Sequence, residues 1–332
     1  MRRGRRIKPS ASMPKPRPRK PKPSVAIIGA GRLGQALALA LQSSGYPVIA
    51  LVARRLQKAE KAAALLGKTL RTKSMPLALA TSRLSELPPA DLTIIATPDD
   101  AIEETARRLA SFQRGRGQRT ILHTSGALSS AVLAPLAEVG FQTGSIHPLV
   151  SVSDAASGAT ALRGAYFCLE GTSKARKLAS TIVSDLGGHS FTIKPERKAL
   201  YHAAAVMASP QVTVLFDLAV EMLAACGLGR RDAQRVLLPL LDSTVNNLKT
   251  STPQQALTGT FARGDLATVR KHLRAITDAD VAQALEIYKL LGLRALQLAA
   301  KNGLRPEREV IRGLLADVLP RIYADERGSD QE

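Results

Sequence analysis

Short apolar runs alternate with helix-like segments through the first half of the chain. Aliphatic and β-branched runs are each followed by a stretch with apolar positions at helical spacing. Strands that alternate with helices in this way are typical of a mostly parallel sheet. The predicted strands are 25–28, 47–53, 91–97, 119–125, 144–149, 165–171 and 189–194, and the first two are followed by the predicted helices 35–43 and 57–66.

After residue 194 the strand pattern stops, and Gly, Pro and Ser/Thr breaks separate long helical patterns. The pattern predicts an α/β domain over 25–192 and an all-helical domain over 193–326, between disordered tails at 1–24 and 327–332. Polar residues, among them Pro210 and Asp217, interrupt the apolar run 203–225, which favours a buried helix over a membrane span. The predicted helices are 195–227, 230–249, 265–276, 278–302 and 306–324.

Charge is concentrated at the N-terminus. Ten of the 47 Lys and Arg residues lie in the Pro-rich segment 1–24, which has no acidic residue. Such a segment buries no apolar surface, so we expect it to be disordered; nucleic acid or an anionic surface is a candidate partner for it. No apolar segment follows the basic residues, so it is not a signal peptide, and Met13 is an alternative start. Cys168 and Cys226 are isolated, which indicates no metal site and a reducing cytoplasm.

The hexamer GAGRLG matches a dinucleotide-binding pattern and stands in the right context. It follows an apolar strand, opens a helix and precedes a second strand. The three glycines would allow a tight turn, close approach of a pyrophosphate and packing of the helix on the strand. The alternative is that the hexamer forms a purely structural turn that binds no ligand. The candidate cofactor-binding residues of this turn are Gly29, Ala30, Gly31, Arg32, Leu33 and Gly34.

The end of the second strand favours NADP over NAD. An NAD site typically has an acidic residue there for the ribose 2′-hydroxyl. This chain has Arg54 and Arg55 instead, and its next acid is Glu60. Two guanidinium groups suit a 2′-phosphate, although either arginine is also explained as a surface charge.

Further candidates follow other strands of the predicted sheet. Thr97, Pro98 and Ser125 are expected beside the nicotinamide, while Asp99 is explained equally well as a helix cap. His123 and His147 lie at or near strand ends, the edge where open α/β sheets bind ligands, so we expect at least one of them to face a substrate.

Seven motifs occur together and in order, and together they resemble one family. They are GAGRLG, ATPDDAI, HTSG, IHPL, KALYHAAAV, LLPLLDSTVNN and ALTGTFARGD. The members of this family are predicted oxidoreductases. They have a Rossmann-like NADP-binding domain and a C-terminal helical domain of unknown function. More distantly the chain is similar to 6-phosphogluconate and 3-hydroxyisobutyrate dehydrogenases and to ketopantoate and pyrroline-5-carboxylate reductases. The resemblance implies an all-helical domain like that of 6-phosphogluconate dehydrogenase.

The resemblance bears most on KALYHAAAV, which begins at Lys198. Several members of the wider group use a helical Lys as proton donor, so Lys198 is the candidate donor and His202, one turn later, its helper. Tyr201 is a candidate substrate contact. The alternative is a solvated Lys198 and a core His202. The chain departs from the family at Ser209-Pro210, where Ser-Asn is usual, and at 258–260, where TGP is usual.

The helical domain contributes a polar set of its own. The candidate substrate-binding residues are Asn247, Thr258, Arg263 and Asp265. Arg263 would bind a substrate carboxylate while Asp265 holds it in place; the alternative is that Asp265 only caps a helix and Arg263 is a surface charge.

These patterns predict an NADP-dependent oxidoreductase of a small, carboxylate-bearing oxo or imine compound, with a ketopantoate-like 2-oxo acid as the narrower hypothesis. A non-catalytic NADP-binding sensor or assembly protein is the alternative. Related reductases imply a homodimer through the helical domain.

Overall fold

The structure is a computed structural model that describes residues 21–69, 77–114, 119–300 and 306–316. It divides into two compact units, Met1–Val206 and Met207–Glu332. The sequence pattern predicted a boundary at residue 193, directly after the last strand. The structure instead assigns the first turns of helix α7 (Lys198–Ala208) to the first unit.

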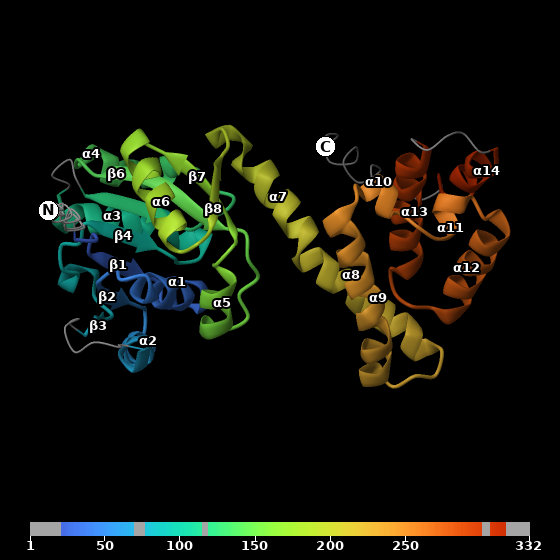
Figure 1. The fold of residues 1–332 in the computed structure, drawn as a ribbon, viewed down its shortest axis with the longest axis horizontal. Coiled ribbons are helices and arrows are strands. Elements are labelled where there is room, and N and C mark those ends of the chain that lie inside the picture. The colour runs from blue at the N-terminus through green and yellow to red at the C-terminus, as the bar shows by residue number, and fades with distance from the viewer. Residues whose placement is uncertain (1–20, 70–76, 115–118, 301–305, 317–332) are drawn as a thin grey trace, which may run out of the picture. The chain divides into compact units, whose positions relative to one another are not determined.

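The first unit is built on one sheet with helices around it (Figure 1). Its eight described strands follow the order β3-β2-β1-β4-β5-β6-β7-β8. Neighbouring strands are parallel except β6 and β7, which are antiparallel. The predicted Rossmann-like sheet is therefore confirmed, whereas the short edge strand β3 was not predicted. The strands are β1 (Val25–Ile28), β2 (Val48–Val52), β3 (Leu79–Thr81), β4 (Leu92–Ile95), β5 (Thr120–His123), β6 (Gln142–Pro148), β7 (Tyr166–Gly171) and β8 (His189–Thr192).

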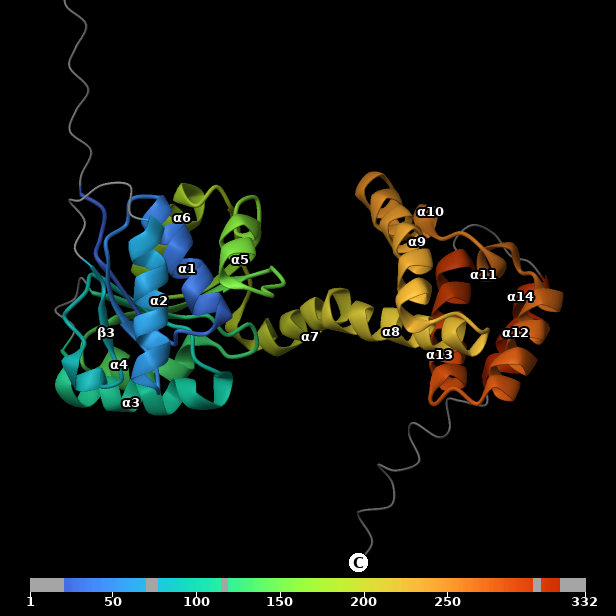
Figure 2. The same cartoon turned by 90° about the horizontal axis from the view of Figure 1, so that it is seen from below.

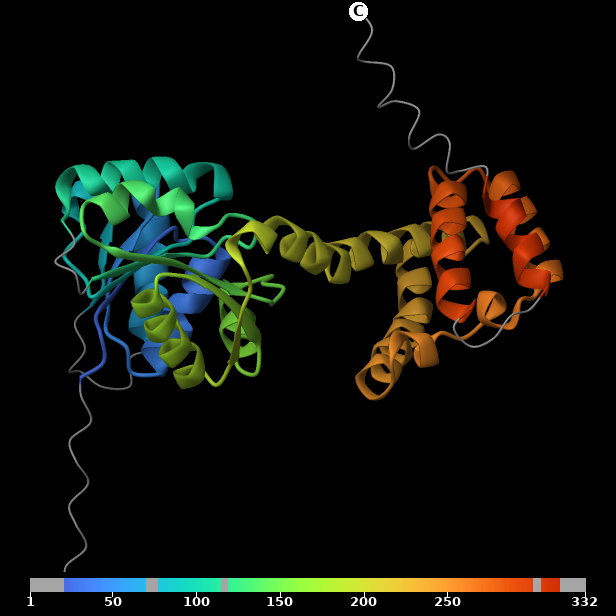
Figure 3. The same ribbon diagram turned by 90° about the horizontal axis from the view of Figure 1, so that it is seen from above.

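Helices cover both faces of this sheet (Figure 3). In β1, Val25 and Ile27 pack with the core under α1, α2, α5 and α6, while Ala26 and Ile28 pack with α3 and α4. Burial on both faces explains why the strands are continuous apolar runs without alternation. The helices are α1 (Arg32–Ser43), α2 (Leu56–Thr69), α3 (Ile102–Phe112), α4 (Ala134–Glu138), α5 (Ala155–Ala161) and α6 (Ser173–Asp185).

The end of the basic segment is attached to the first unit. Residues 1–20 lie outside the described part of the chain. Lys22 donates hydrogen bonds to Asp185 and to the carbonyl of Ser44, both at 2.7 Å, and its amine lies 4.5 Å from the ring centre of Tyr46. Ser24 bonds Asp91. The prediction of disorder up to residue 24 is therefore wrong for these last residues, because they have polar partners on the sheet domain.

Where the structure describes the second unit, it contains helices and no strand, as predicted, and α8 contacts α9 in it (Figure 2). Pro210 is the first residue of α8 and separates it from α7, since proline cannot donate a helical hydrogen bond. The helices that follow α7 are α8 (Pro210–Ala225), α9 (Arg230–Thr250), α10 (Pro253–Ala256), α11 (Thr260–Arg263), α12 (Leu266–Ala279), α13 (Ala284–Ala300) and α14 (Pro306–Leu315).

The helices over 195–225 are mostly not buried, so the sequence prediction of a buried helix over 203–225 is wrong. Only Lys198 in α7 and Val220 in α8 are buried, and the exposed fractions of Val214 and Leu200 are 64% and 66%. Pro195–Ala225 is also, by length and composition alone, the one stretch among the described residues that could cross a membrane. That criterion is weak evidence, since core helices of soluble proteins meet it as well. The apolar surface follows from α8 packing mainly on α9 within the described chain.

Candidate functional site

The glycine turn between β1 and α1 is shaped to admit a ligand. Gly29 has a φ of +110°, and a Cβ built on it would lie 2.4 Å from the carbonyl oxygen of Ala96. A Cβ on Gly34 would lie 1.9 Å from the carbonyl oxygen of Gly29. Nothing lies within 4 Å of a Cβ built on Gly31, so the fold itself leaves that position open.

The start of α1 is suited to a phosphate group. No side chain caps this 12-residue helix at Gly31, so its first N–H groups are available to an anion. In its first turn Arg32 is exposed and Leu33 half-buried, while Ala30 before it is buried. Next to the turn, the Thr97 hydroxyl is buried and has no hydrogen-bond partner among the described residues. An open glycine, uncapped N–H groups and an unpaired hydroxyl fit a bound dinucleotide.

Two arginines follow the second strand at the same edge. Arg54 and Arg55 are exposed, and neither side chain has an ion-pair or hydrogen-bond partner in the part of the chain that the structure describes. Glu60, the next acidic residue, is already inside α2. The position that takes a ribose hydroxyl in NAD sites is thus occupied by cations.

The loops after β4 and β5 are tied together. The Ser125 hydroxyl donates to the Asp99 carboxylate at 2.7 Å and accepts from the N–H groups of Ala127 and Leu128. Asp99 therefore links the two loops, whereas the residue at the N-cap of the short helix Asp99–Ala101 is Pro98. The contact joins the turn region around Thr97 to the loop that contains Gly126.

His123 stabilises this loop and has no nitrogen left for a substrate. The side chain is fully buried; its Nδ1 accepts from the N–H of Ser125, and its Nε2 lies 3.2 Å from the carbonyl oxygen of Ser129. Burial, and then the nearby charge of Lys198, lowers the pKa of His123 to about 3. Its expected substrate contact is therefore corrected: backbone groups of its own loop occupy both ring nitrogens.

A half-buried cluster of His147, Tyr201 and His202 lies over Gly126. Nδ1 of His147 is 2.7 Å from the Tyr201 hydroxyl, and the His147 and His202 rings meet edge to face at 5.7 Å between centroids. A Cβ on Gly126 would lie 2.4 Å from His202 and 2.8 Å from His147, so only glycine lets both rings approach the loop. Burial, then Lys198 and His202, lowers the pKa of His147 to about 4. Burial and Cys168 raise the pKa of Tyr201.

Lys198 lies beneath this cluster and is 1% exposed. Its amine donates to the carbonyl oxygen of Ser125 at 2.9 Å and to the Ser145 hydroxyl at 3.1 Å. Burial lowers its pKa, and the carboxylates of Glu170 and Asp99 act in the opposite direction. Lys198 and His202 share one helix as predicted, but only His202 is partly open to solvent.

Sequence reasoning missed Glu170 and the setting of Cys168. Glu170 is 5% exposed, and its carboxylate accepts from the N–H and the hydroxyl of Ser130 at 2.6 and 2.7 Å. Cys168 is fully buried beside Tyr201, and burial raises the pKa of its thiol. A single acidic residue inside the apolar run YFCLEG was the available signal for Glu170.

The four candidates of the helical domain all belong to the second unit. Asp265 caps α12, because its carboxylate accepts from the N–H and hydroxyl of Thr268, and these bonds lower its pKa. The cap that sequence reasoning left open is therefore present. Asn247, Thr258 and Arg263 are exposed.

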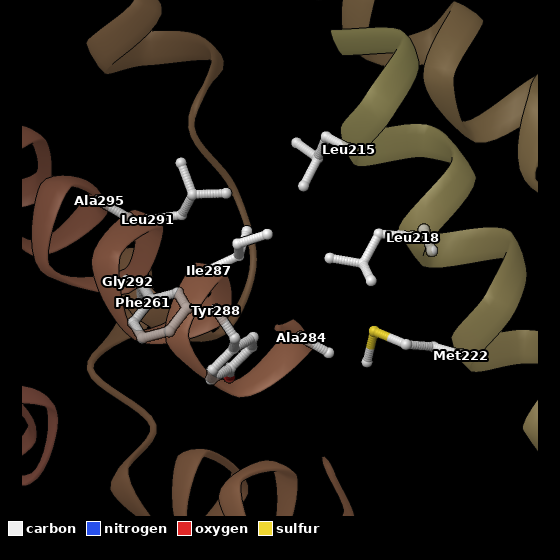
Figure 4. Close-up of a pocket in the computed structure, with 11 residues that line it drawn as sticks. Leu215, Leu218, Met222, Phe261, Ala284, Ile287, Tyr288, Leu291, Gly292 and Ala295 are labelled. Atoms are coloured by element: carbon white, nitrogen blue, oxygen red, sulfur yellow. The ribbon is translucent and has the colours of Figure 1, made fainter. Parts of the chain in front are cut away.

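The second unit also has an apolar pocket of about 250 Å³ between α8 and α13 (Figure 4). Leu215, Met222, Ile287 and Tyr288 are among the residues that line it. None of the predicted site residues does. In the described chain no group of three or more His, Cys, Asp or Glu side chains is placed to hold a metal ion.

Comparison with solved structures gives the same fold. A proposed NADP oxidoreductase from Bacteroides fragilis is 24% identical with a TM-score of 0.66, and covers 83% of this chain and 98% of its own. An imine reductase from Streptomyces aurantiacus is 17% identical with a TM-score of 0.54 (88% and 99% covered). A Plasmodium falciparum pyrroline carboxylate reductase, solved with NADP bound, is 13% identical with a TM-score of 0.54 (87% and 98% covered). At such identities the likeness establishes the fold.

Two family models match successive parts of the sequence. A Rossmann-like domain matches residues 10–148, and a domain of unknown function, DUF2520, matches residues 165–295. No curated protein matches the chain. The resemblance inferred from the seven motifs is confirmed: the chain joins a Rossmann-like domain to a DUF2520 domain.

Proposed function

We propose that the chain is an NADP-dependent oxidoreductase that reduces a small oxo or imine compound carrying a carboxylate. A 2-oxo acid like ketopantoate is the narrower candidate, and the imine reductases of the same fold support including cyclic imines. The observation that carries the proposal is the half-buried His147–Tyr201–His202 cluster over Gly126. It lies at the sheet edge that also bears the open glycine turn.

The contacts along this edge connect the two features. Gly29 lies against Ala96, Asp99 bonds Ser125, and Gly126 lies against His147 and His202. In open α/β sheets the carboxyl edge of the strands is where ligands bind. When bound, NADPH would supply a hydride to the substrate carbon. Gly31 and the start of α1 would hold its pyrophosphate, Thr97 and Pro98 would border the nicotinamide, and Arg54 and Arg55 would bind the 2′-phosphate.

The histidines meet the chemical need of the reduction. Reduction of a C=O or C=N bond leaves negative charge on oxygen or nitrogen, so a hydrogen-bond donor and a proton source are required there. His202 is half-exposed, so its imidazole can exchange protons with solvent, and histidine is the side chain that most often serves as a general acid. We assign the proton to His202 and the hydrogen bond to His147. Lys198, the donor suggested by the sequence, is buried beneath them.

Turnover with a substrate panel tests the function. NADPH and a set of 2-oxo acids and cyclic imines are mixed with the protein, and the nicotinamide absorbance is followed. We expect one compound class to be reduced and NADPH to be consumed in proportion. Tight binding of NADPH without turnover on any compound would favour the alternative, a sensor or assembly protein that binds NADP without chemistry.

We also propose that a second copy of the chain covers the apolar surface of α8 and α9. Val214 and Leu240 are 64% and 66% exposed, and other exposed apolar residues line the same two helices. Soluble monomers rarely expose so many adjacent apolar side chains, and a two-fold pair of identical surfaces is self-complementary.

The mass in solution, from light scattering, tests the dimer. We expect twice the chain mass for the native protein and the monomer mass for Leu240→Asp. Lys174→Asp, at an exposed position of α6 in the first unit, should remain dimeric. A monomeric native protein at micromolar concentration would contradict the proposal.

A further inference from the structure

We propose that Lys198 is a positioning residue for His147: it fixes the place of this imidazole and disfavours a second proton on it, while the single proton lies on Nε2, the nitrogen near Gly126. The inference rests on the proposed function, because it assigns the hydrogen-bond donor of that reaction to one atom. Lys198 then acts on the substrate through His147 and does not contact the substrate itself.

The first step is the position of the Lys198 amine. It bonds Ser145, which is two residues before His147 on β6 and therefore on the same face of the sheet. It also bonds the carbonyl of Ser125, next to the Gly126 that contacts the His147 ring. Lys198 thus fixes both the strand that carries His147 and the loop that the ring faces.

The second step is the charge that His147 faces. Burial has the largest effect on Lys198 and lowers its pKa, while two oxygen acceptors and the nearby Glu170 and Asp99 favour its ammonium form. A cation close to a half-buried imidazole disfavours a second positive charge, in agreement with the lowered pKa of His147. The titratable groups around His147 are Lys198, Tyr201 and His202 from α7, Cys168 and Glu170 from β7, His123 from β5 and Asp99 from the loop after β4.

The third step is the tautomer. Burial raises the pKa values of Tyr201 and Cys168, so at neutral pH both keep their protons. The Tyr201 O–H has two possible acceptors, Nδ1 of His147 and the sulfur of Cys168. A thiol sulfur is a weak acceptor, and Nδ1 lies at 2.7 Å. Tyr201 therefore donates to Nδ1, and the proton of neutral His147 remains on Nε2.

Nε2 is also the nitrogen that lies against the loop. A Cβ on Gly126 would be 2.8 Å from both Cε1 and Nε2 of His147. The N–H of a neutral imidazole is thus presented beside His202. It can donate a hydrogen bond to the oxygen or nitrogen that gains negative charge, while His202 delivers the proton.

Nuclear magnetic resonance on the full chain, with labelled histidine, tests the proposal without cofactor or substrate. The chain has five histidines, and His147→Gln assigns the relevant signals. We expect wild-type His147 to be neutral at pH 7 with hydrogen on Nε2. In Lys198→Met its titration midpoint should rise by about one pH unit, because a nearby positive charge is removed. Lys194→Met, which removes an exposed lysine of the same connection, should leave the midpoint unchanged.

A folded Lys198→Met with an unchanged midpoint, or a proton on Nδ1 in the wild type, would overturn the proposal. If Lys198→Met does not fold, Tyr201→Phe supplies the test, since it removes the partner of Nδ1 and should give a mixture of tautomers; an unchanged single tautomer would overturn it as well. The expected shifts in a protein that reduces nothing would refute the proposed function while leaving the arrangement of Lys198 and His147 intact.

Discussion

Replacing His202 by glutamine is expected to lower kcat by about 100- to 10,000-fold, the range typical of a lost general acid. The fold should not change, because His202 is half-exposed. The affinity for NADPH should not change either, because His202 contacts the Gly126 loop and not the glycine turn at Gly29. Glutamine keeps a hydrogen-bonding side chain of similar reach but has no proton to give. Steady-state kinetics on the best substrate of the panel, together with NADPH titration, measure both effects.

His189→Gln is the matched control for this variant. His189 is exposed at the start of β8, and its ring lies 5.1 Å from that of Tyr166, tilted by 34°, outside the cluster over Gly126. It should retain the wild-type kcat. If His202→Gln also retained kcat within about threefold, less than any general acid typically contributes, the proton would have to come from another group.

Replacing Arg54 and Arg55 by alanine, singly and together, is expected to weaken NADPH binding by about 10- to 100-fold while NADH binding changes little. A charge-assisted hydrogen bond contributes about 1.5–3 kcal/mol, and only NADPH has the 2′-phosphate that these arginines would bind. Both side chains are exposed and make no ion pair within the described chain, so their removal should not disturb the fold. Fluorescence titration with each cofactor gives the two Kd values.

Arg108→Ala controls for the loss of one surface charge. The Arg108 side chain is exposed and lies in the second turn of α3, which leads away from the binding edge. It should leave both Kd values unchanged. Equal affinities of the wild type for NADPH and NADH would contradict the assignment of NADP, and the chain would then have to recognise the ribose without these arginines.

Local sequence features predicted the part of the fold that we propose binds a dinucleotide. The turn from Gly29 to Gly34 depends on backbone geometry and on contacts a few residues away, so its pattern is legible in one short segment. The direction of β7 could not be predicted from the sequence, because an apolar strand has the same composition whether it runs parallel or antiparallel to its neighbour. The edge strand β3 has three residues, too few for a recognisable period.

Most members of the site were predictable, although Glu170 and Cys168 were missed, and the roles of the members were not predictable. Lys198 stands among charged residues in KPERK, which suggests solvent, yet tertiary packing buries it against Ser125 and Ser145. His123 and His147 look alike as strand-end histidines, and only the positions of Ser125 and Ser129 show that the first is fully hydrogen-bonded. The predicted burial of α8 failed because apolar composition indicates that a surface will be covered, not which part of the chain covers it.

The transfer of deuterium from NADPH that carries deuterium at both positions of carbon 4 of the nicotinamide tests the central claim most directly. The protein is incubated with the labelled cofactor and each 2-oxo acid or cyclic imine of the panel, and the product is examined by mass spectrometry. The account predicts one deuterium per molecule of product, matched by an equal amount of NADP⁺, and loss of this product in His202→Gln. Tight binding of NADPH with no deuterium in any product would contradict it.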